Sequence, residues 1–268
     1  YMASAGGFDQ LMETEGCAQE FRFAEGAQSV ARAMAAHLGD RVRLNSAVRH
    51  IRDDGRRVEI GTDDGTLTAD HVVVAVSPAA AVRLRFTPEL PPARRRRMER
   101  CPMGDVAKVH TVYDRPFWRE RGLSGQATVY GDPAVGVVFD NSPAAADVGV
   151  LVSFVYGERL QRWAELPAEQ RRAEVLTTLE TLFGPDAGAP SRYTDKIWPA
   201  DEWAGGGYAA NPTPGTWTEH GAAGRRTATG RIHWAGTETA DVWNGYIDGA
   251  ISSGQRAAAE ILAAIAAP

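Results

Sequence analysis

Residues 231–262 constrain the fold more than any other part of the chain. They predict a short buried strand, a turn rich in Gly and Thr, a loop with two aromatic residues, and a helix that begins near Tyr246 or Ile247. Small and apolar residues recur at helical spacing and predict one apolar stripe: Ala250, Ile251, Gly254, Ala257, Ala258, Ile261, Leu262 and Ile265. A turn that delivers glycines to a helix N-terminus directs unpaired N–H groups and a positive dipole end at whatever lies there. The segment therefore predicts a structural strand–turn–helix unit or a binding site at the helix start.

The first third of the chain predicts one helix followed by short strands. Residues 27–38 have the spacing of an amphipathic helix that ends at Gly39. Asp-Gly pairs flanked by alternating apolar residues are strong hairpin signals, and the β-branched run 71–76 is typical of a strand buried on both faces. The expected strands before that run are 42–44, 47–51, 57–60 and 66–68.

The middle of the chain changes character. A short Arg-rich helix at 92–100 precedes four expected strands and two helices, at 107–113, 127–130, 135–140, 148–156, 158–163 and 167–183. A sheet with segregated helices predicts an α+β domain inserted into an α/β nucleotide-binding domain of Rossmann type that is only partly present. The expected division is 1–24 (the end of a substrate-domain segment), 25–81 (part of the nucleotide-binding domain), 82–197 (substrate domain) and 198–268 (the closing segment).

Composition excludes several kinds of partner. The net charge of −5 argues against nucleic acid, and the run Arg94–Arg97 is expected to be the solvated face of a helix. No apolar run has the length of a membrane span. Two cysteines cannot build a disulfide framework, which fits the cytoplasm, and the six histidines show no metal-ligand spacing.

Lys108 is the first candidate for chemistry. Along the expected strand 107–113 it shares a face with His110 and Val112, opposite Ala107 and Val109. A lysine in such a strand is most often at a sheet edge or on a solvent face. The pattern by itself favours that structural role.

The second candidate site is the segment from Trp198 to Tyr208. Three consecutive glycines, Gly205–Gly207, allow a backbone to approach a flat ligand closely, or they form a flexible loop. The aromatic residues around them, Trp198, Trp203 and Tyr208, are core anchors as often as they are cofactor contacts.

These segments together resemble the flavin-containing amine oxidases, the monoamine and polyamine oxidase family. The similarity runs from about Gly6 to the C-terminus and is most specific in Arg115–Trp118, Trp198–Tyr208 and Ala235–Ala250. The resemblance implies that Lys108 reaches the flavin N5 through a water and assists reoxidation by O2. It also implies that Tyr208 and Tyr246 form an aromatic cage that guides an amine to the flavin.

The same resemblance implies contacts to FAD. Gly236, Thr237 and Glu238 would approach the ribityl and pyrophosphate region through backbone N–H groups, and Tyr246 and Ile247 would place helix-start amides at the flavin C2=O and N1. Val48 corresponds to the residue that brackets the adenine. Trp198 and Trp203 belong to the flavin-facing loop, and Ala250 closes the motif. Because Gly207 stands where a thioether-forming cysteine precedes the cage tyrosine in mammalian monoamine oxidases, the FAD is expected to be bound non-covalently.

One part of the family pattern is absent from this sequence. No G-x-G-x-x-G motif follows any expected strand. The chain is therefore expected to be the C-terminal portion of an amine oxidase, as a fragment, a truncated gene product or one subunit of a split enzyme. It would oxidise an amine C–N bond by hydride transfer to flavin, with O2 reduced to H2O2, and require the missing N-terminal portion. The alternatives are an L-amino-acid oxidase and an inactive fragment without tightly bound FAD. Homodimer formation is left open.

Overall fold

The computed structural model describes residues 2–12, 15–18, 20–144, 147–220 and 223–266, and it divides into two compact units. The first unit is formed by residues 1–102 and 209–268, and the second by residues 103–208. The secondary structure is mixed, as expected for an α/β domain with an α+β insertion. Residues 1, 13, 14 and 19 of the expected segment 1–24 and residues 267 and 268 of the expected closing segment lie outside the described residues.

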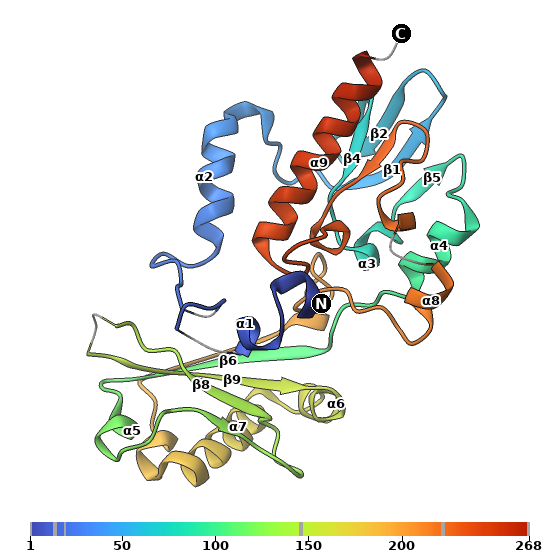
Figure 1. Ribbon diagram of the computed structural model, residues 1–268. Coiled ribbons are helices and arrows are strands. Elements are labelled where there is room, and N and C mark those ends of the chain that lie inside the picture. Colours follow the sequence, from blue (N-terminus) through green and yellow to red (C-terminus); the bar gives the residue numbers. More distant parts are fainter. Residues whose placement is uncertain (1, 13–14, 19, 145–146, 221–222, 267–268) are drawn as a thin grey trace. The chain divides into compact units, whose positions relative to one another are not determined.

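The second unit is built on a five-stranded antiparallel sheet with strand order β10-β6-β9-β8-β7 (Figure 1). Its strands are β6 (Val106–Tyr113), β7 (Ala127–Thr128), β8 (Val137–Asp140), β9 (Gly149–Tyr156) and β10 (Arg192–Ile197). Its helices are α5 (Phe117–Glu120), α6 (Glu158–Ala164) and α7 (Ala168–Phe183). Strand β10 was not expected, because its alternation of charged and half-buried residues is that of an edge strand and carries a weak hydrophobic signal.

One face of this sheet carries the core of the second unit. Val109 of β6 and Val155 of β9 are fully buried against Leu160 and Trp163 of α6 and Val175 of α7. From Ala107 onward, burial alternates along β6, so that Lys108, His110 and Val112 lie on the opposite face. The expected two faces of this strand are thus confirmed.

The first unit contains two small sheets. One has the strand order β3-β2-β1-β5, and the other is the parallel pair β11-β4. The strands are β1 (Val48–Asp53), β2 (Val58–Thr62), β3 (Gly65–Ala69), β4 (Val72–Val74), β5 (Arg85–Thr87) and β11 (Ile232–Trp234). The helices are α1 (Phe8–Met12), α2 (Gln28–Leu38), α3 (Pro78–Ala81), α4 (Pro92–Glu99), α8 (Thr216–His220) and α9 (Ile247–Ala266).

Several expectations for the first unit need correction. Residues 42–44 form no strand, because the chain turns there through Asn45 at φ 56°. The run 71–76 is not buried on both faces, since Val73 is 37% and Val76 47% exposed. The buried side of α9 is formed by Gly249, Ser253 and Ala257. Most of the expected apolar stripe of that helix therefore faces away from the described residues.

Helix α4 also differs from expectation. Arg94 is buried, because its guanidinium stacks 4.2 Å from the Trp234 ring and donates to the carbonyls of Gly224 and Thr227. The run Arg94–Arg97 is therefore only partly a solvated face. α4 packs against α3 and α8 within the first unit, and the second unit begins at Met103, whereas the expected substrate domain begins at residue 82.

Candidate functional site

Lys108 lies on an interior strand of the second unit. It is paired with Phe154 of β9 on one side and with Lys196 of β10 on the other, so the sheet-edge position that its pattern favoured is wrong. Its Nζ lies 5.3 Å from the Phe154 ring centre and 5.6 Å from the Tyr208 ring centre. Burial lowers the pKa of this ammonium. The result is a half-buried cation held over two aromatic faces.

The Tyr208 ring completes a small aromatic cluster with Phe154, at a centroid distance of 6.0 Å and an edge-to-face angle of 64°. Tyr208 is nevertheless 68% exposed within the protein. Phe154 was not predicted as a site residue. Only the pairing of β6 with β9 places it opposite Lys108, and a single sequence does not reveal strand pairing. Cross-strand pairs of this kind determine which side chains meet on a sheet face.

The glycine segment before Tyr208 is fixed by the start of β6. Gly206, at φ 143°, approaches the backbone so closely that a Cβ there would lie 2.6 Å from Gly104 O and from Met103 Cβ. The Gly207 N–H donates to Gly104 O at 2.8 Å. These contacts exclude the freely flexible loop that the glycine run also allowed. Glycine is required here by a close approach of backbone to backbone.

Asp201 fixes the beginning of the same loop. Its carboxylate accepts the N–H groups of Trp203 and Ala204 and pairs with Lys196 Nζ at 2.7 Å. The Ala204 N–H and the Lys196 ammonium are the main reasons that the pKa of Asp201 falls to about 2. Trp203 is 61% exposed, and Trp198 is half-buried with Lys196 Nζ 5.5 Å from its ring. The loop thus holds two indole rings and a phenol in place.

The remaining side chains on this sheet face are mostly apolar. Phe139 of β8 and Phe154 of β9 are in edge-to-face contact at 6.0 Å, and Val152 lies across the strand from His110. His110 is half-buried, and burial together with Lys108 lowers its pKa. It is therefore a neutral imidazole at neutral pH. The face combines a cation, a neutral hydrogen-bonding ring and aromatic surface.

The turn between β11 and α9 is organised by Thr237 in the first unit. Its hydroxyl accepts the Gly245 N–H at 2.7 Å and donates to the Tyr246 carbonyl at 2.9 Å. The Gly236 N–H is already donated to Ser253 Oγ at 3.0 Å. Backbone donation from this turn to a ligand is therefore left to Thr237 and Glu238.

The start of α9 is shaped by a second close approach. A Cβ at Gly249 would lie 2.2 Å from the Trp243 carbonyl oxygen, so a side chain does not fit there. Tyr246 stacks edge-to-face on Trp243 at 5.2 Å. Ile247 and Ala250 are exposed, and the first amides of a helix have no partner within the helix. The Tyr246 N–H is already donated to the Trp243 carbonyl at 3.0 Å, so of the two helix-start amides expected at the flavin only that of Ile247 remains as a candidate donor.

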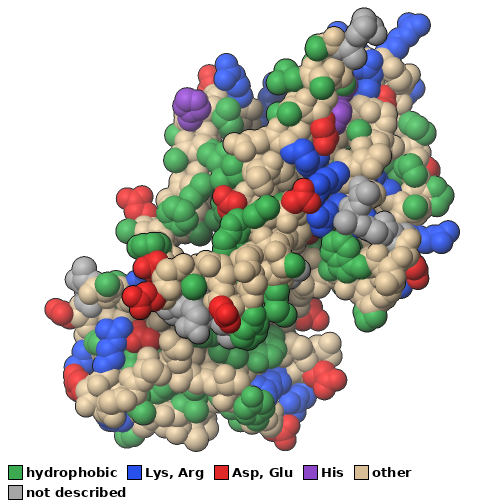
Figure 2. All heavy atoms as spheres, viewed as in Figure 1, with side chains coloured by type: hydrophobic (Ala, Val, Ile, Leu, Met, Phe, Trp, Pro, Cys, Tyr) green, Lys and Arg blue, Asp and Glu red, His purple; other side chains and the backbone are tan. Residues whose placement is uncertain are grey.

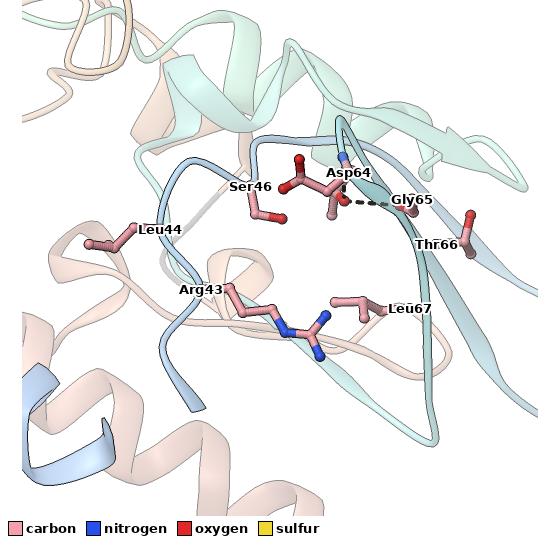
Figure 3. Close-up of a pocket in the computed structure, with 8 residues that line it drawn as sticks. Arg43, Leu44, Ser46, Asp64, Gly65, Thr66 and Leu67 are labelled. Atoms are coloured by element: carbon pink, nitrogen blue, oxygen red, sulfur yellow. Dashed lines mark hydrogen bonds between the residues drawn. The ribbon is translucent and has the colours of Figure 1, made fainter. Parts of the chain in front are cut away.

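Two predicted cofactor residues are placed differently from the others. The Glu238 carboxylate turns away from the helix start and accepts the Ala210 N–H at 3.2 Å. Val48 begins β1 and is paired with Thr62. Thr62 also lines an open cavity of about 340 Å³ with Arg43, Leu44 and the β2–β3 turn (Figure 3). The structure therefore brings Lys108 and Tyr208 together in one unit and Gly236, Thr237, Tyr246 and Ile247 together in the other.

The donors and rings present fit a flavin. The ligand has a flat, largely apolar ring with carbonyl oxygens at one end, and the exposed Trp203 and Tyr208 rings offer flat apolar surface. The amides at the start of α9 offer N–H groups and a positive dipole end to a carbonyl or to negative charge. The Lys108 ammonium, which lies near the Tyr208 ring, adds a positive charge that complements negative charge on a reduced flavin.

The comparisons with known proteins agree with these observations. Residues 1–262 match the family model of the flavin-containing amine oxidoreductases. A Mycobacterium tuberculosis protein that carries the name flavin-containing monoamine oxidase AofH is 43% identical over 263 residues, which are 98% of this chain and 57% of that protein. A Synechocystis L-amino acid dehydrogenase is 40% identical over 88% of this chain and 50% of its own length. The structure of cyclohexylamine oxidase from Brevibacterium oxydans is 34% identical, has a TM-score of 0.90, and covers 99% of this chain and 58% of that chain.

This chain belongs to the flavin-containing amine oxidoreductase family. It spans about half the length of the curated relatives that it matches.

Within the described residues, no group of His, Cys, Asp and Glu side chains is arranged to hold a metal ion. None of the helices in the described part of the chain is long and apolar enough to cross a bilayer.

Proposed function

We propose that this chain supplies the substrate side and the isoalloxazine side of a flavin-dependent amine oxidase. The observation that carries the proposal is the half-buried Lys108 ammonium over the rings of Phe154 and Tyr208. The reaction converts an amine, O2 and water to a carbonyl compound, the released amine or ammonia, and H2O2. FAD, when bound, accepts the hydride from the amine carbon and transfers the electrons to O2.

The side chains of this chain would position and polarise the reactants. The Lys108 ammonium holds a water by hydrogen bonding and stabilises the negative charge that develops on oxygen. Tyr208 and Phe154 provide aromatic surface along which a neutral amine or its apolar substituent packs. The N–H groups at the start of α9 stabilise negative charge by roughly 0.3–1 kcal/mol through the helix dipole. Tyr246 is assigned the second wall of the aromatic cage.

FAD is assigned as a non-covalent cofactor, because Gly207 has no sulfur to form a thioether. The FAD pyrophosphate contacts are assigned to a further portion or subunit. Two features of the first unit support this partner. β4 and β11 form a parallel sheet of only two strands, and the apolar residues Ile251, Leu262 and Ile265 of α9 are exposed. Figure 2 shows hydrophobic side chains on the visible surface of the region formed by α2 and α9.

Two alternatives remain, and the first has specific support. The Synechocystis relative is named for L-amino acids, so an amino-acid substrate is the nearest rival. Such a substrate needs a cation, usually Arg, for its carboxylate. On the β9 side of Lys108 and His110, the facing side chains Phe154 and Val152 are apolar, which favours a simple amine, whereas Lys196 and Arg192 of β10 are cations on the same face. The second alternative is an inactive chain without tight FAD. A cytoplasmic location is consistent with the free thiols of Cys17 and Cys101.

A reconstitution experiment tests the proposal. The chain is purified alone and with the N-terminal portion of the M. tuberculosis relative that it does not cover, and each sample is titrated with FAD. Flavin absorbance that is bleached by an amine, with stoichiometric peroxide, supports the proposal. A sample that binds FAD but responds only to L-amino acids supports the oxidase alternative. Failure to bind FAD in both samples contradicts the proposed function.

A further inference from the structure

A second cavity lies in the first unit, on the side of the β11–α9 turn to which Glu238 is directed. Its volume is about 80 Å³, and its lining comes from Val76 and α3, from α4 and Cys101, from parts of the segment 210–225, and from Trp234, Ala235, Glu238, Thr239 and Asn244. Six of the lining side chains are charged or aromatic: Arg94, Arg97, Trp217, Arg225, Trp234 and Glu238. Gly236, Thr237, Tyr246 and Ile247 do not line it. Glu238 is the one residue of this lining that is also assigned to the flavin, so the cavity adjoins the β11–α9 turn on the side away from Thr237 and Ile247.

Three side chains that line this cavity each carry a buried hydrogen-bond donor without an acceptor. The donors are Arg97 Nη1, Arg225 Nε and Trp234 Nε1. Trp234 is only 4% exposed. Among the described residues, six buried side-chain polar atoms lack a partner, and three of them belong to residues that line this cavity. Because buried donors are almost always paired in native proteins, the cluster indicates an acceptor-rich ligand.

The side chains that line the cavity carry more positive than negative charge. Three guanidiniums line it against one carboxylate, that of Glu238. Arg94 donates to carbonyl oxygens, which do not neutralise charge, and Asp241, 3.6 Å from Arg225, also pairs with Arg226. Burial lowers the pKa of Arg94 and of Arg225 to about 10, so both remain protonated at neutral pH. The cavity therefore carries an excess of positive charge.

The cation excess distinguishes an anion from water as the occupant. Water molecules can accept the three N–H groups, but they cannot offset the charge of buried guanidiniums. A carboxylate or phosphate offers several oxygens that match the fork of an Arg guanidinium. The volume suits a group of this size and is too small for a nucleotide. Trp217, which lies 5.7 Å from the Arg97 guanidinium and 5.3 Å from that of Arg225, holds both cations beside the cavity.

We propose that the cavity formed by Arg97, Arg225 and Trp234 is a binding site for a small oxyanion, a carboxylate or a phosphate group. The site shares Glu238 with the turn assigned to the flavin, whereas Lys108, Tyr208 and Tyr246 do not line it. Binding would tie α4 to the segment that carries α8 and the β11–α9 turn. The anion would therefore stabilise the scaffold on which Thr237 and Tyr246 are positioned.

The test uses the purified chain and two probes, inorganic phosphate and acetate. Binding is measured by calorimetry and by the melting temperature, with ionic strength held constant by NaCl. The net charge of −5 opposes non-specific attraction of anions, so a saturable signal reports a site. We expect saturable binding, tighter for phosphate. Arg97→Met is expected to weaken it at least about tenfold, because a charge-assisted donor is lost. The control Arg96→Met, at an exposed position of the same helix, is expected to change it less than about twofold.

A second comparison covers the case in which Arg97→Met changes folding. In NaCl alone, its melting temperature should equal or exceed that of Arg96→Met, because a half-buried cation whose Nη1 has no acceptor has been removed; in phosphate the order should reverse. Trp234→Phe is expected to weaken phosphate binding through loss of its single donor. The proposal is overturned if neither anion binds saturably to the unsubstituted protein, or if Arg97→Met and Arg96→Met bind phosphate equally.

Discussion

The Thr237 hydroxyl connects the two ends of the loop that precedes α9. It accepts the N–H of Gly245 and donates to the carbonyl of Tyr246, and so fixes the residue at which the helix begins. Thr237 and Tyr246 are adjacent in space although eight residues, among them Trp243, lie between them in the chain. The position of the helix-start amides thus depends on one side chain.

Removing this hydroxyl should destabilise the first unit. Thr237→Val keeps the shape of the side chain and leaves the Gly245 N–H without its acceptor, for an expected loss of about 1–3 kcal/mol in the free energy of unfolding. Urea denaturation followed by circular dichroism measures the effect. Thr66→Val, on the exposed face of β3, is the matched control, with an expected change within about 0.5 kcal/mol. Equal effects of the two substitutions would contradict this role of Thr237.

The Gly206 conformation should tolerate no side chain. Gly206→Ala places a methyl group against Gly104 O at a positive φ, and we expect a loss of about 1–3 kcal/mol or more. Gly254→Ala is the opposite case, because its Cβ would meet no atom within 4 Å in the middle of α9. It should stabilise the chain by about 0.5–1 kcal/mol. Thermal unfolding of both variants checks the pair.

Lys108 should influence the oxygen reaction more than amine oxidation. In the reconstituted protein, Lys108→Met removes the cation near Phe154 and Tyr208 and should slow flavin reoxidation about 10²-fold. Stopped-flow measurements separate this step from reduction by the amine. Arg192→Met removes an exposed cation from β10 and serves as the control. A normal reoxidation rate in Lys108→Met would argue against the assigned role.

The paired histidines beneath α9 should make stability depend on pH. His71 Nδ1 lies 3.2 Å from His233 Nε2, and burial followed by the neighbouring His233 lowers the pKa of His71. Arg231, Asp70 and Asp53 also act on His71, and Glu260 lies 3.6 Å from His233. Because the folded state holds this proton less tightly than the unfolded state, stability is complete above the unfolded value of about 6.5 and falls as the pH decreases through it.

Urea denaturation between pH 5 and 8 measures this dependence. His71→Gln should reduce the slope of unfolding free energy against pH in the acidic half of the range. His37→Gln, on the exposed α2, provides the comparison at a second histidine. A slope that His71→Gln leaves unchanged would exclude His71 as the titrating group.

The sequence predicted the elements whose signals are local. The alternation along β6 identified the face shared by Lys108 and His110, and the predicted start of the last helix near Tyr246 or Ile247 agrees with α9, which begins at Ile247. It did not predict Phe154 beside Lys108, because strand pairing joins residues far apart in the chain. It also missed the burial of Arg94, since stacking on Trp234 overrides the hydrophilic pattern of the Arg run. Tertiary packing determined these outcomes.

The junction at Pro102 and Asn211 has a consequence for how the chain folds and how its parts evolve. The Asn211 N–H donates to the Pro102 carbonyl at 2.8 Å, and the Thr213 N–H donates to the Arg100 carbonyl at 2.9 Å. The backbone therefore leaves the first unit and returns to it at a single point. The parallel pairing of β4 with β11 does not require residues 103–208 to span any distance, and the entropy of closing a loop grows only slowly with its length. Insertions or deletions within residues 103–208, or replacement of that whole segment, should therefore leave the pairing of β4 with β11 intact.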